Sequence, residues 1–212
     1  MSDTSVELID FMGSDLSVVN AARVSMDKAS QWNTTNLATY AGPEDKILHE
    51  NDVKLIKYLA KHNHWTPFGH AFASFRIKAP IFIARQLGKH QVGLVWNEVS
   101  RRYVDSDPEF YEPSEWRAKA PNVKQGSSID TVEDNVGICI EYTNAVKECY
   151  LTYKKMLDHG VCPEQARMIL PQSMMTEWIW SGSLYAFSRV CNLRIDPHTQ
   201  KETQVIAWKI DE

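Results

Sequence analysis

The sequence predicts an α+β fold, in which a mostly antiparallel sheet packs against long helices. Two observations support this prediction. Segments with strand-like and helix-like periodicity do not alternate as βαβ units, so a parallel sheet is not expected. No linker interrupts the 212 residues, and this length fits one domain with a sizeable hydrophobic core. Residues 1–212 are therefore expected to form a single domain.

The first half of the chain is predicted to contain both strands and amphipathic helices. We expect strands over residues 6–11 and 71–77, and helices over 16–24, 52–62 and from Pro80 to about His90. Ser14 or Asp15 suits the cap of the first helix, and Pro80 suits the first turn of the third. Residues 26–45 are polar and contain Gly42-Pro43, which predicts a loop insertion.

The second half is predicted to be mostly helical. Three prolines make residues 108–126 irregular. We then expect a helix over 129–159, a short helix from Pro163, a strand over 174–180, a helix through Leu184–Cys191 and a last helix from near His198. Gly160 lies where the cap of the long helix falls, and the short helix must stop before Pro171.

Composition excludes several classes of partner. Hydrophobic residues make up 43% of the chain and charged residues 24%, as in a soluble globular protein. A net charge of −4 argues against a broad nucleic-acid surface, and no apolar run approaches the roughly 20 residues of a membrane span. The N-terminus shows no signal-peptide pattern, and the four cysteines show no zinc spacing. We expect a cytoplasmic protein with reduced thiols and no bound metal.

The run from Lys89 to Tyr103 carries the strongest chemical signal. It holds three fixed cations, a histidine, a carboxylate and a hydroxyl among apolar residues. Half-buried cations need partners, and Arg101 and Arg102 directly follow Ser100, a trio that suits a phosphate. The alternative is structural, because Glu98 and Arg102 are four residues apart and can form a surface ion pair.

Three imidazoles lie close together at His62, His64 and His70. Such a cluster can bind metal, but Pro67 forces a turn before His70 and makes that geometry unfavourable. Two other interpretations stay open. The histidines are exposed at a helix end, or they belong to a polar loop that contacts a ligand through Thr66 and an imidazole.

Two arginines lie in apolar surroundings. Arg167 sits on an otherwise apolar helix, where it either pairs with a carboxylate or contacts a phosphate or pyrimidine. Arg194 follows the apolar stripe of another helix, and Asp196-Pro197 after it resembles the capped start of the last helix. No cysteine has an evident nucleophile context.

The order of these motifs resembles the flavin-dependent thymidylate synthase family. The matching segments are His62-x-His64-x-Thr66-Pro67-Phe68-x-His70, Lys78-Ala79-Pro80-Ile81-Phe82-x-Ala84-Arg85-Gln86, Asn97-Glu98-x-Ser100-x-Arg102-Tyr103, Ala166-Arg167-x-x-Leu170-Pro171 and Asn192-Leu193-Arg194-x-Asp196-x-His198. The early Met12-Gly13-x-Asp15-Leu16 and Ala21-Ala22-Arg23-Val24-Ser25 also resemble the family's first strand and helix. The resemblance covers nearly the whole chain, and it implies the fold of the thymidylate synthase complementing proteins.

The resemblance implies an activity and its cofactors. dUMP would be converted to dTMP, with FAD bound, NADPH as reductant and methylenetetrahydrofolate as carbon donor. No enzyme cysteine would attack the pyrimidine, so the protein's role would be orientation and electrostatics around the cofactor. The family also implies a homotetramer with shared active sites.

The resemblance also implies residue roles. It assigns dUMP binding to Gln86, Lys89, Glu98, Ser100, Arg101, Arg102, Arg167 and Arg194. It assigns FAD binding to His64, Thr66, Lys89, His90, Gln91, Glu98, Ser183, Tyr185, Arg189 and His198. The catalytic candidates are Arg194 and Ser100. Arg194 falls where an arginine favours the ionised pyrimidine N3, and its charge persists at any working pH.

Several positions depart from the family pattern. Lys89-His90-Gln91 replaces the Arg-His-Arg signature, and eight residues instead of seven separate it from Ser100. Gly69 stands where many members carry a glutamate, and Ser183, Tyr185 and Arg189 replace the usual Asn, Arg and Asn. These changes fall on the flavin side. Two alternatives follow: a sibling enzyme that methylates or hydroxymethylates another pyrimidine nucleotide, and a nucleotide-binding regulator without flavin.

Overall fold

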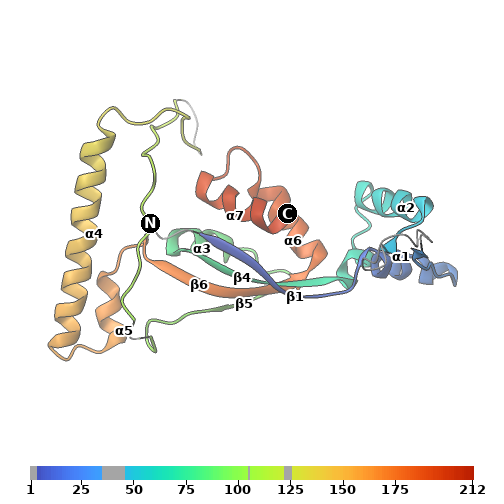
Figure 1. Ribbon diagram of the computed structural model, residues 1–212, viewed down its shortest axis with the longest axis horizontal. Coiled ribbons are helices and arrows are strands. Elements are labelled where there is room, and N and C mark those ends of the chain that lie inside the picture. Colours follow the sequence, from blue (N-terminus) through green and yellow to red (C-terminus); the bar gives the residue numbers. More distant parts are fainter. Residues whose placement is uncertain (1–3, 35–45, 105, 122–125) are drawn as a thin grey trace, which may run out of the picture.

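A four-stranded antiparallel sheet forms the middle of an elongated molecule (Figure 1). The computed structural model describes residues 4–34, 46–104, 106–121 and 126–212. The strand order is β1 (Ser5–Met12), β4 (Phe72–Pro80), β6 (Met175–Ser183) and β5 (Leu94–Glu98). Three helices cover one face: α3 (Ile81–Leu87), α6 (Leu184–Arg194) and α7 (Lys201–Asp211). The predicted α+β class is confirmed.

Alternation along the two central strands builds the core. Ile77 pairs in register with Trp178, and Phe75 with Trp180, so both pairs face the helices. On the opposite face Ser74 pairs with Ser181, and their hydroxyls are 2.8 Å apart. The period-2 pattern thus separates an apolar, helix-covered face from a polar one.

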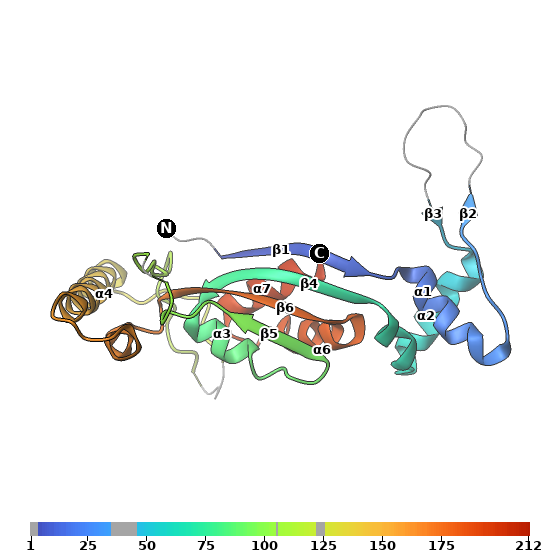
Figure 2. The same ribbon diagram turned by 90° about the horizontal axis from the view of Figure 1, so that it is seen from below.

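One end of the sheet carries a small helical group (Figure 2). It consists of α1 (Asp15–Arg23), η1 (Val24–Met26), α2 (Glu50–Lys61) and η2 (Thr66–His70). Ser14 is the N-cap of α1, and Ser17 Oγ accepts from its backbone N–H at 3.1 Å. Within the predicted loop, β2 (Asn33–Thr34) pairs with β3 (Lys46–Ile47), and residues 35–45 lie outside the described residues.

The other end carries α4 (Asn135–Asp158), α5 (Pro163–Ala166) and η3 (Arg167–Ile169). The prediction that the long helix begins at Ile129 is wrong, because Asp134 caps it: Asp134 Oδ1 accepts from the Gly137 N–H at 2.9 Å. Just before that, Val132 N–H donates to Trp116 O at 2.9 Å and holds the chain in an extended loop. Gly160 follows the helix at φ +81°, as predicted.

Other boundaries also differ from the prediction, most clearly those of α3 and of the last helix. Pro80 is the N-cap of α3, and α3 ends at Leu87, before His90. The last helix begins at Lys201 with Gln200 as its N-cap, so capping by Asp196 is wrong; Asp196 Oδ1 instead accepts from the His198 N–H at 2.8 Å. Among the described residues, no helix combines the length and apolarity needed to cross a membrane.

Candidate active site

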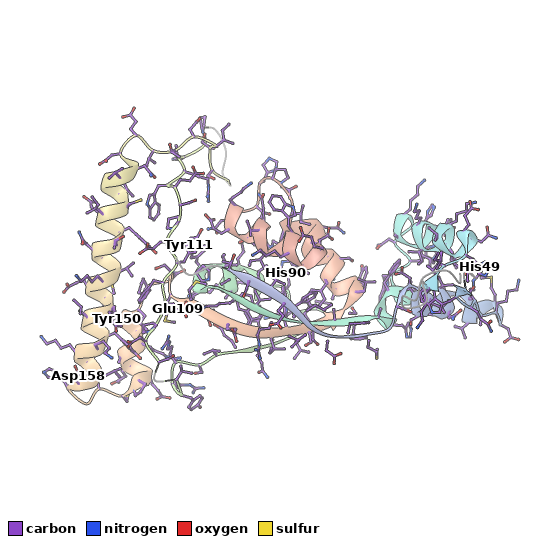
Figure 3. All side chains as sticks on the ribbon, viewed as in Figure 1. His49, His90, Glu109, Tyr111, Tyr150 and Asp158 are labelled. Carbon is purple, nitrogen blue, oxygen red and sulfur yellow. The ribbon has the colours of Figure 1, made fainter. Side chains whose placement is uncertain are left out.

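The turn after α3 brings His90 against Arg194 on α6 (Figure 3 labels His90). Arg194 Nε donates to His90 Nε2 at 2.9 Å, so this ring nitrogen must carry a lone pair. Burial, followed by the charges of Arg194 and Arg189, lowers the pKa of His90. The imidazole is therefore neutral near pH 7 and accepts the bond that orients Arg194.

Three hollows, each lined in part by α3, include some of the candidate residues in their walls. Hollow A, of about 580 Å³, includes Glu98, Arg101 and Arg167 in its walls. Hollow B, of about 410 Å³, lies between α3 and β5 and includes Lys89, His90, Gln91 and Glu98. Hollow C, of about 550 Å³, includes Gln86, Arg194 and His198.

Glu98 lines both hollow A and hollow B. Its Oε1 accepts from the Thr176 hydroxyl at 2.7 Å, and its Oε2 accepts from Trp96 Nε1 at 3.2 Å. Trp96 in turn stacks on Trp178, with ring centroids 4.3 Å apart. The carboxylate is thus positioned from the core, as expected for a residue between two ligands.

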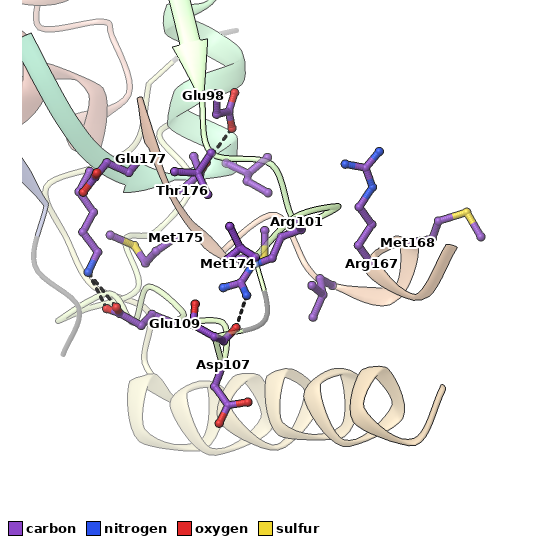
Figure 4. A pocket seen from close by; sticks show the side chains of 16 residues that line it. Glu98, Arg101, Asp107, Glu109, Arg167, Met168, Met174, Met175, Thr176 and Glu177 are labelled. Atoms are coloured by element: carbon purple, nitrogen blue, oxygen red, sulfur yellow. Dashed lines mark hydrogen bonds and ion pairs between the residues drawn. The ribbon is translucent and has the colours of Figure 1, made fainter. Parts of the chain in front are cut away.

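The Ser100–Arg102 trio lies in a turn beside hollow A. Arg101 donates to the Ser106 carbonyl, and Arg102 Nε donates to Ser100 Oγ at 3.3 Å. Arg102 also lies 3.7 Å from Glu164, so part of the surface-pair alternative is present with a different carboxylate. Arg167 lines hollow A, and its side chain has no hydrogen bond or ion pair with another described residue (Figure 4). Its predicted carboxylate partner is absent from the described part of the chain, which favours an anionic ligand.

The remaining flavin-side candidates gather where α6 meets η2. Leu184 N–H donates to Ala71 O at 2.8 Å and docks the start of α6. The Tyr185 ring lies 5.5 Å from Trp65, and the Arg189 guanidinium lies 5.9 Å from the Tyr185 ring. Ser183 is the N-cap of α6, and its Oγ accepts from Ala186 N–H at 3.2 Å. That helix-capping bond gives Ser183 a structural role in this chain.

The structure does not bring all candidates together. His64, Thr66, Ser183, Tyr185 and Arg189 line none of hollows A, B and C, and Ser100 and Arg102 lie beside hollow A without lining it. Among the described residues, no group of three or more His, Cys, Asp or Glu side chains has the arrangement of a metal site. The His62 and His64 rings instead lie 4.4 and 5.9 Å from the Tyr58 ring.

Sequence reasoning missed two threonines that support the site. Thr176 holds Glu98, and the buried Thr203 of α7 donates its hydroxyl to Gln86 Oε1. That bond leaves the amide NH₂ of Gln86 free to donate in hollow C. A polar residue on the buried face of a strand or helix could have pointed to both: Thr176 in β6 is 7% exposed and Thr203 in α7 is 0% exposed. Such residues need a hydrogen-bonding partner.

The residues around His90 fit an anionic, aromatic cofactor. Lys89 and Arg189 have no ion pair with a carboxylate in the described segments, and both side chains are exposed. Trp65 is 52% exposed beside Tyr185, and the Tyr185 ring lies 5.9 Å from the Arg189 guanidinium, so an exposed ring surface lies near this cation. Fixed cations suit a pyrophosphate and exposed rings suit a planar heterocycle.

The fold and these residues define an α+β protein with fixed cations and an oriented carboxylate around openings that α3 helps to line. The chain belongs to the thymidylate synthase complementing protein family, whose model matches residues 7–212. The resemblance seen in the motifs is thereby confirmed.

Relatives and solved structures agree with this membership. A flavin-dependent thymidylate synthase of Kosmotoga olearia is 38% identical over 208 residues, which cover 97% of this chain and 82% of its own. One from Thermus thermophilus is 36% identical over 98% of this chain and 70% of its own. The UMP/dUMP methylase PolB of Streptomyces cacaoi, solved with 5-Br dUMP, superimposes with a TM-score of 0.80 at 30% identity, over 99% of this chain and 89% of its own.

Proposed function

We propose that the protein is a flavin-dependent thymidylate synthase that reductively methylates dUMP to dTMP. Bound FAD, reduced by NADPH, would supply the hydride, and methylenetetrahydrofolate would supply the carbon. One observation carries the proposal: a chain that matches such synthases over 97–98% of its length brings Gln86, His90 and Arg194 together around α3.

Arg194 and Gln86 would bind the pyrimidine in hollow C. The bond to neutral His90 uses Arg194 Nε and leaves the terminal nitrogens to face an anionic N3. Gln86, held by Thr203, presents its NH₂ to a pyrimidine carbonyl. A fixed cation lowers the cost of the anionic ring, which is the state that must react at C5.

Ser100, Arg101, Arg102 and Arg167 would bind the phosphate, with Lys89 and Glu98 beside it. Lys89, His90 and Gln91, with His64, Thr66, Ser183, Tyr185, Arg189 and His198, would hold FAD. In one chain these residues do not gather around one opening, which is why we propose a homotetramer whose subunits complete one another's sites. The four cysteines of the chain are free thiols, which is consistent with the proposed cytoplasmic location.

No cysteine is positioned to act as a nucleophile. None of the four lines hollow A, B or C. Cys191 is buried in the core, and burial raises its thiol pKa to about 11, so its thiolate is disfavoured. This agrees with a mechanism in which the protein supplies orientation and charge rather than a covalent bond.

The direct test is turnover with defined substrates. Purified protein with FAD should show a flavin absorption spectrum and, under anaerobic conditions with NADPH and methylenetetrahydrofolate, convert dUMP to dTMP by mass spectrometry. dUMP binding without any FAD binding would support the flavin-free regulator instead. FAD binding without dTMP formation would exclude the synthase.

Arg194→Ala separates chemistry from binding. We expect kcat to fall by about 10²-fold or more, with a much smaller change in dUMP affinity, because the charge acts on the developing anion. Lys54→Ala, which removes an exposed cation on α2, should change neither value. Loss of dUMP affinity alone would remove Arg194 from the catalytic role.

A second candidate is methylation of UMP. PolB, a UMP/dUMP methylase, was also solved with 5-Br UMP and superimposes with a TM-score of 0.81 at 28% identity. Parallel assays with UMP, dUMP and dCMP, read by product mass, decide between the candidates. A higher kcat/KM for UMP than for dUMP would favour the ribonucleotide.

A further inference from the structure

A close backbone contact holds the turn that carries His90. This turn, residues 88–93, joins α3 to β5 and lies beside the end of β6 and the start of α6 (Figure 2). β5 begins directly after it at Leu94, which pairs in register with Gly182 of β6. Gly93 therefore meets β6 just before the two strands pair, at a position where β6 has no side chain.

Gly182 leaves a space on the helix-covered face of β6. Side chains on this face recur at every second residue, so the row of Trp178 and Trp180 continues at Gly182. The Gly93 carbonyl occupies the place of the next side chain. A Cβ on Gly182 would overlap Gly93 O, and it would lie 2.6 Å from Leu94 Cδ2. A larger residue at position 182 must therefore displace the turn.

Gly93 is restricted from the other side. Its φ of +77° lies in the left-handed region that favours glycine. A Cβ on Gly93 would also lie 3.2 Å from the Ala186 Cβ of α6. The turn is thus fitted between β6 and α6 by two glycines, and we call the contact of Gly93 with Gly182 the glycine seat.

Few other contacts fix the turn. At its start, His90 N–H donates to Leu87 O at 2.9 Å, which ties it to the end of α3. At its end, Leu94 N–H donates to Gln91 O at 3.4 Å, which is long for a hydrogen bond. Among the described residues, the one side-chain hydrogen bond of the turn joins His90 to Arg194. The position of the turn relative to α6 therefore depends on this bond and on the glycine seat.

We propose that Gly182 is a positioning residue, because the space that it leaves sets where His90 meets Arg194. Gly93 lies three residues after His90, so displacing the turn at the seat moves the imidazole away from the guanidinium. Arg194 Nε then loses the acceptor that orients its terminal nitrogens. The effect on flavin binding rests on the proposed function, whereas the effect on His90 does not.

The test is the titration of His90 in the full-length protein without ligand, followed by NMR and assigned with His90→Gln. In the wild type, burial and then the charges of Arg194 and Arg189 on α6 hold the pKa of His90 below its ordinary value of 6.5. In Gly182→Ala the ring moves away from both, so the pKa of His90 should rise toward 6.5. A wild-type pKa of His90 in a folded Gly182→Ala variant would overturn the proposal.

Ser181→Ala is the matched control. Ser181 is the neighbouring residue of β6, and its hydroxyl lies 2.8 Å from that of Ser74 on the opposite face of the sheet. The variant loses a hydrogen bond from the same strand, so its melting temperature should fall, but the pKa of His90 should stay at the wild-type value. Equal shifts in Ser181→Ala and Gly182→Ala would mean that general destabilisation moves His90, which contradicts a positioning role.

FAD binding separates this proposal from the proposed function. Quenching of flavin fluorescence measures the affinity. We expect Gly182→Ala to bind FAD about tenfold more weakly than the wild type, as expected for the loss of a hydrogen bond to a charged group, and Ser181→Ala to bind it equally well. A wild-type protein that binds no FAD would contradict the proposed function, while the titration of His90 would still decide the role of Gly182.

Gly93→Ala decides the question if Gly182→Ala does not fold. Position 93 is exposed in the turn, so this variant should fold, and thermal unfolding checks that it does. Its added Cβ presses on Ala186 from the other side of the seat, and its backbone is strained at a φ of +77°. The pKa of His90 should therefore rise here too. An unchanged pKa of His90 in Gly93→Ala would overturn the proposal.

Discussion

Each end of the sheet carries its own group of helices (Figures 1 and 2), and the two groups differ in how completely they bury their side chains. At the α1–α2 end, Val18, Val19 and Leu59 are at most 6% exposed, and a buried ion pair links the helices. At the α4 end, only Tyr153 among the 24 residues of the helix is buried. The first end therefore has a small buried core of its own, whereas α4 at the second end leaves almost all of its surface uncovered in a single chain.

Breaking the Arg23–Asp52 ion pair at the α1–α2 end should have the largest effect on the free energy of unfolding. Asp52 is 1% exposed and accepts from Arg23 Nε and from the Ser30 hydroxyl, each at 3.0 Å. Asp52→Ala leaves both donors without an acceptor. Because Arg23 stays partly exposed, we expect a loss of about 2–4 kcal/mol, near or below the usual cost of breaking a buried pair. Unfolding in guanidinium chloride measures this loss of unfolding free energy. A loss below about 0.5 kcal/mol would show that the ion pair does not hold this end together.

The same pair predicts a pH dependence. Burial raises the pKa of Asp52, but the hydrogen bonds from Arg23 and Ser30 outweigh burial and hold it below its ordinary value. A lowered folded-state pKa adds stability above the unfolded-state pKa of about 3.9, and that stability is lost as the pH falls below it. The difference in unfolding free energy between wild type and Asp52→Ala should be constant above about pH 5 and shrink toward pH 3. A constant difference down to pH 3 would contradict this assignment.

The contrast between the ends also explains what the sequence could predict. Elements on the covered face, such as β4, β6 and α6, follow periods of 2 and 3.6 because burial imposes them. The predicted helix boundaries were wrong where an individual hydrogen bond, rather than burial, decides where the helix begins. Apolar residues from Ile129 continue the helical spacing of α4, yet Asp134 caps the helix and Trp116 pairs with the preceding segment. Contacts between distant segments leave no local pattern.

The candidate site shows the same division. Motif order predicted roles for His90, Glu98 and Arg194, and the structure adds how each side chain is held. The supporting Thr176 and Thr203 contact partners 78 and 117 residues away, so no spacing rule points to them.

Removing the N-cap of α4 tests whether the α4 end folds independently of the α1–α2 end. Asp134→Ala removes the acceptor of the Gly137 N–H and should cost about 1 kcal/mol, within the usual range for an N-cap. Hydrogen exchange of the first turn of α4 should rise, while exchange in α1 stays unchanged. Asp158→Ala, at the last residue of the helix, is the matched control and should have little effect. Faster exchange in α1 as well would mean that the two ends unfold as one unit.

Substituting an exposed apolar residue of α4 should have the smallest effect on the free energy of unfolding but a clear effect on subunit assembly. Val136 and Ile140 are 70% and 58% exposed and lie four residues apart, so they share one face of the helix. Ile140→Ser should change the free energy of unfolding of the separated chain by only about 0.5 kcal/mol, since little area is buried. If this face covers another subunit in the proposed tetramer, sedimentation velocity should show partial dissociation at low micromolar protein. Glu141→Ser, at the neighbouring and more polar position, should leave assembly intact. An unchanged distribution for Ile140→Ser would mean that the tetramer, if formed, uses another surface, and that α4 stays exposed to solvent as it is in the single chain.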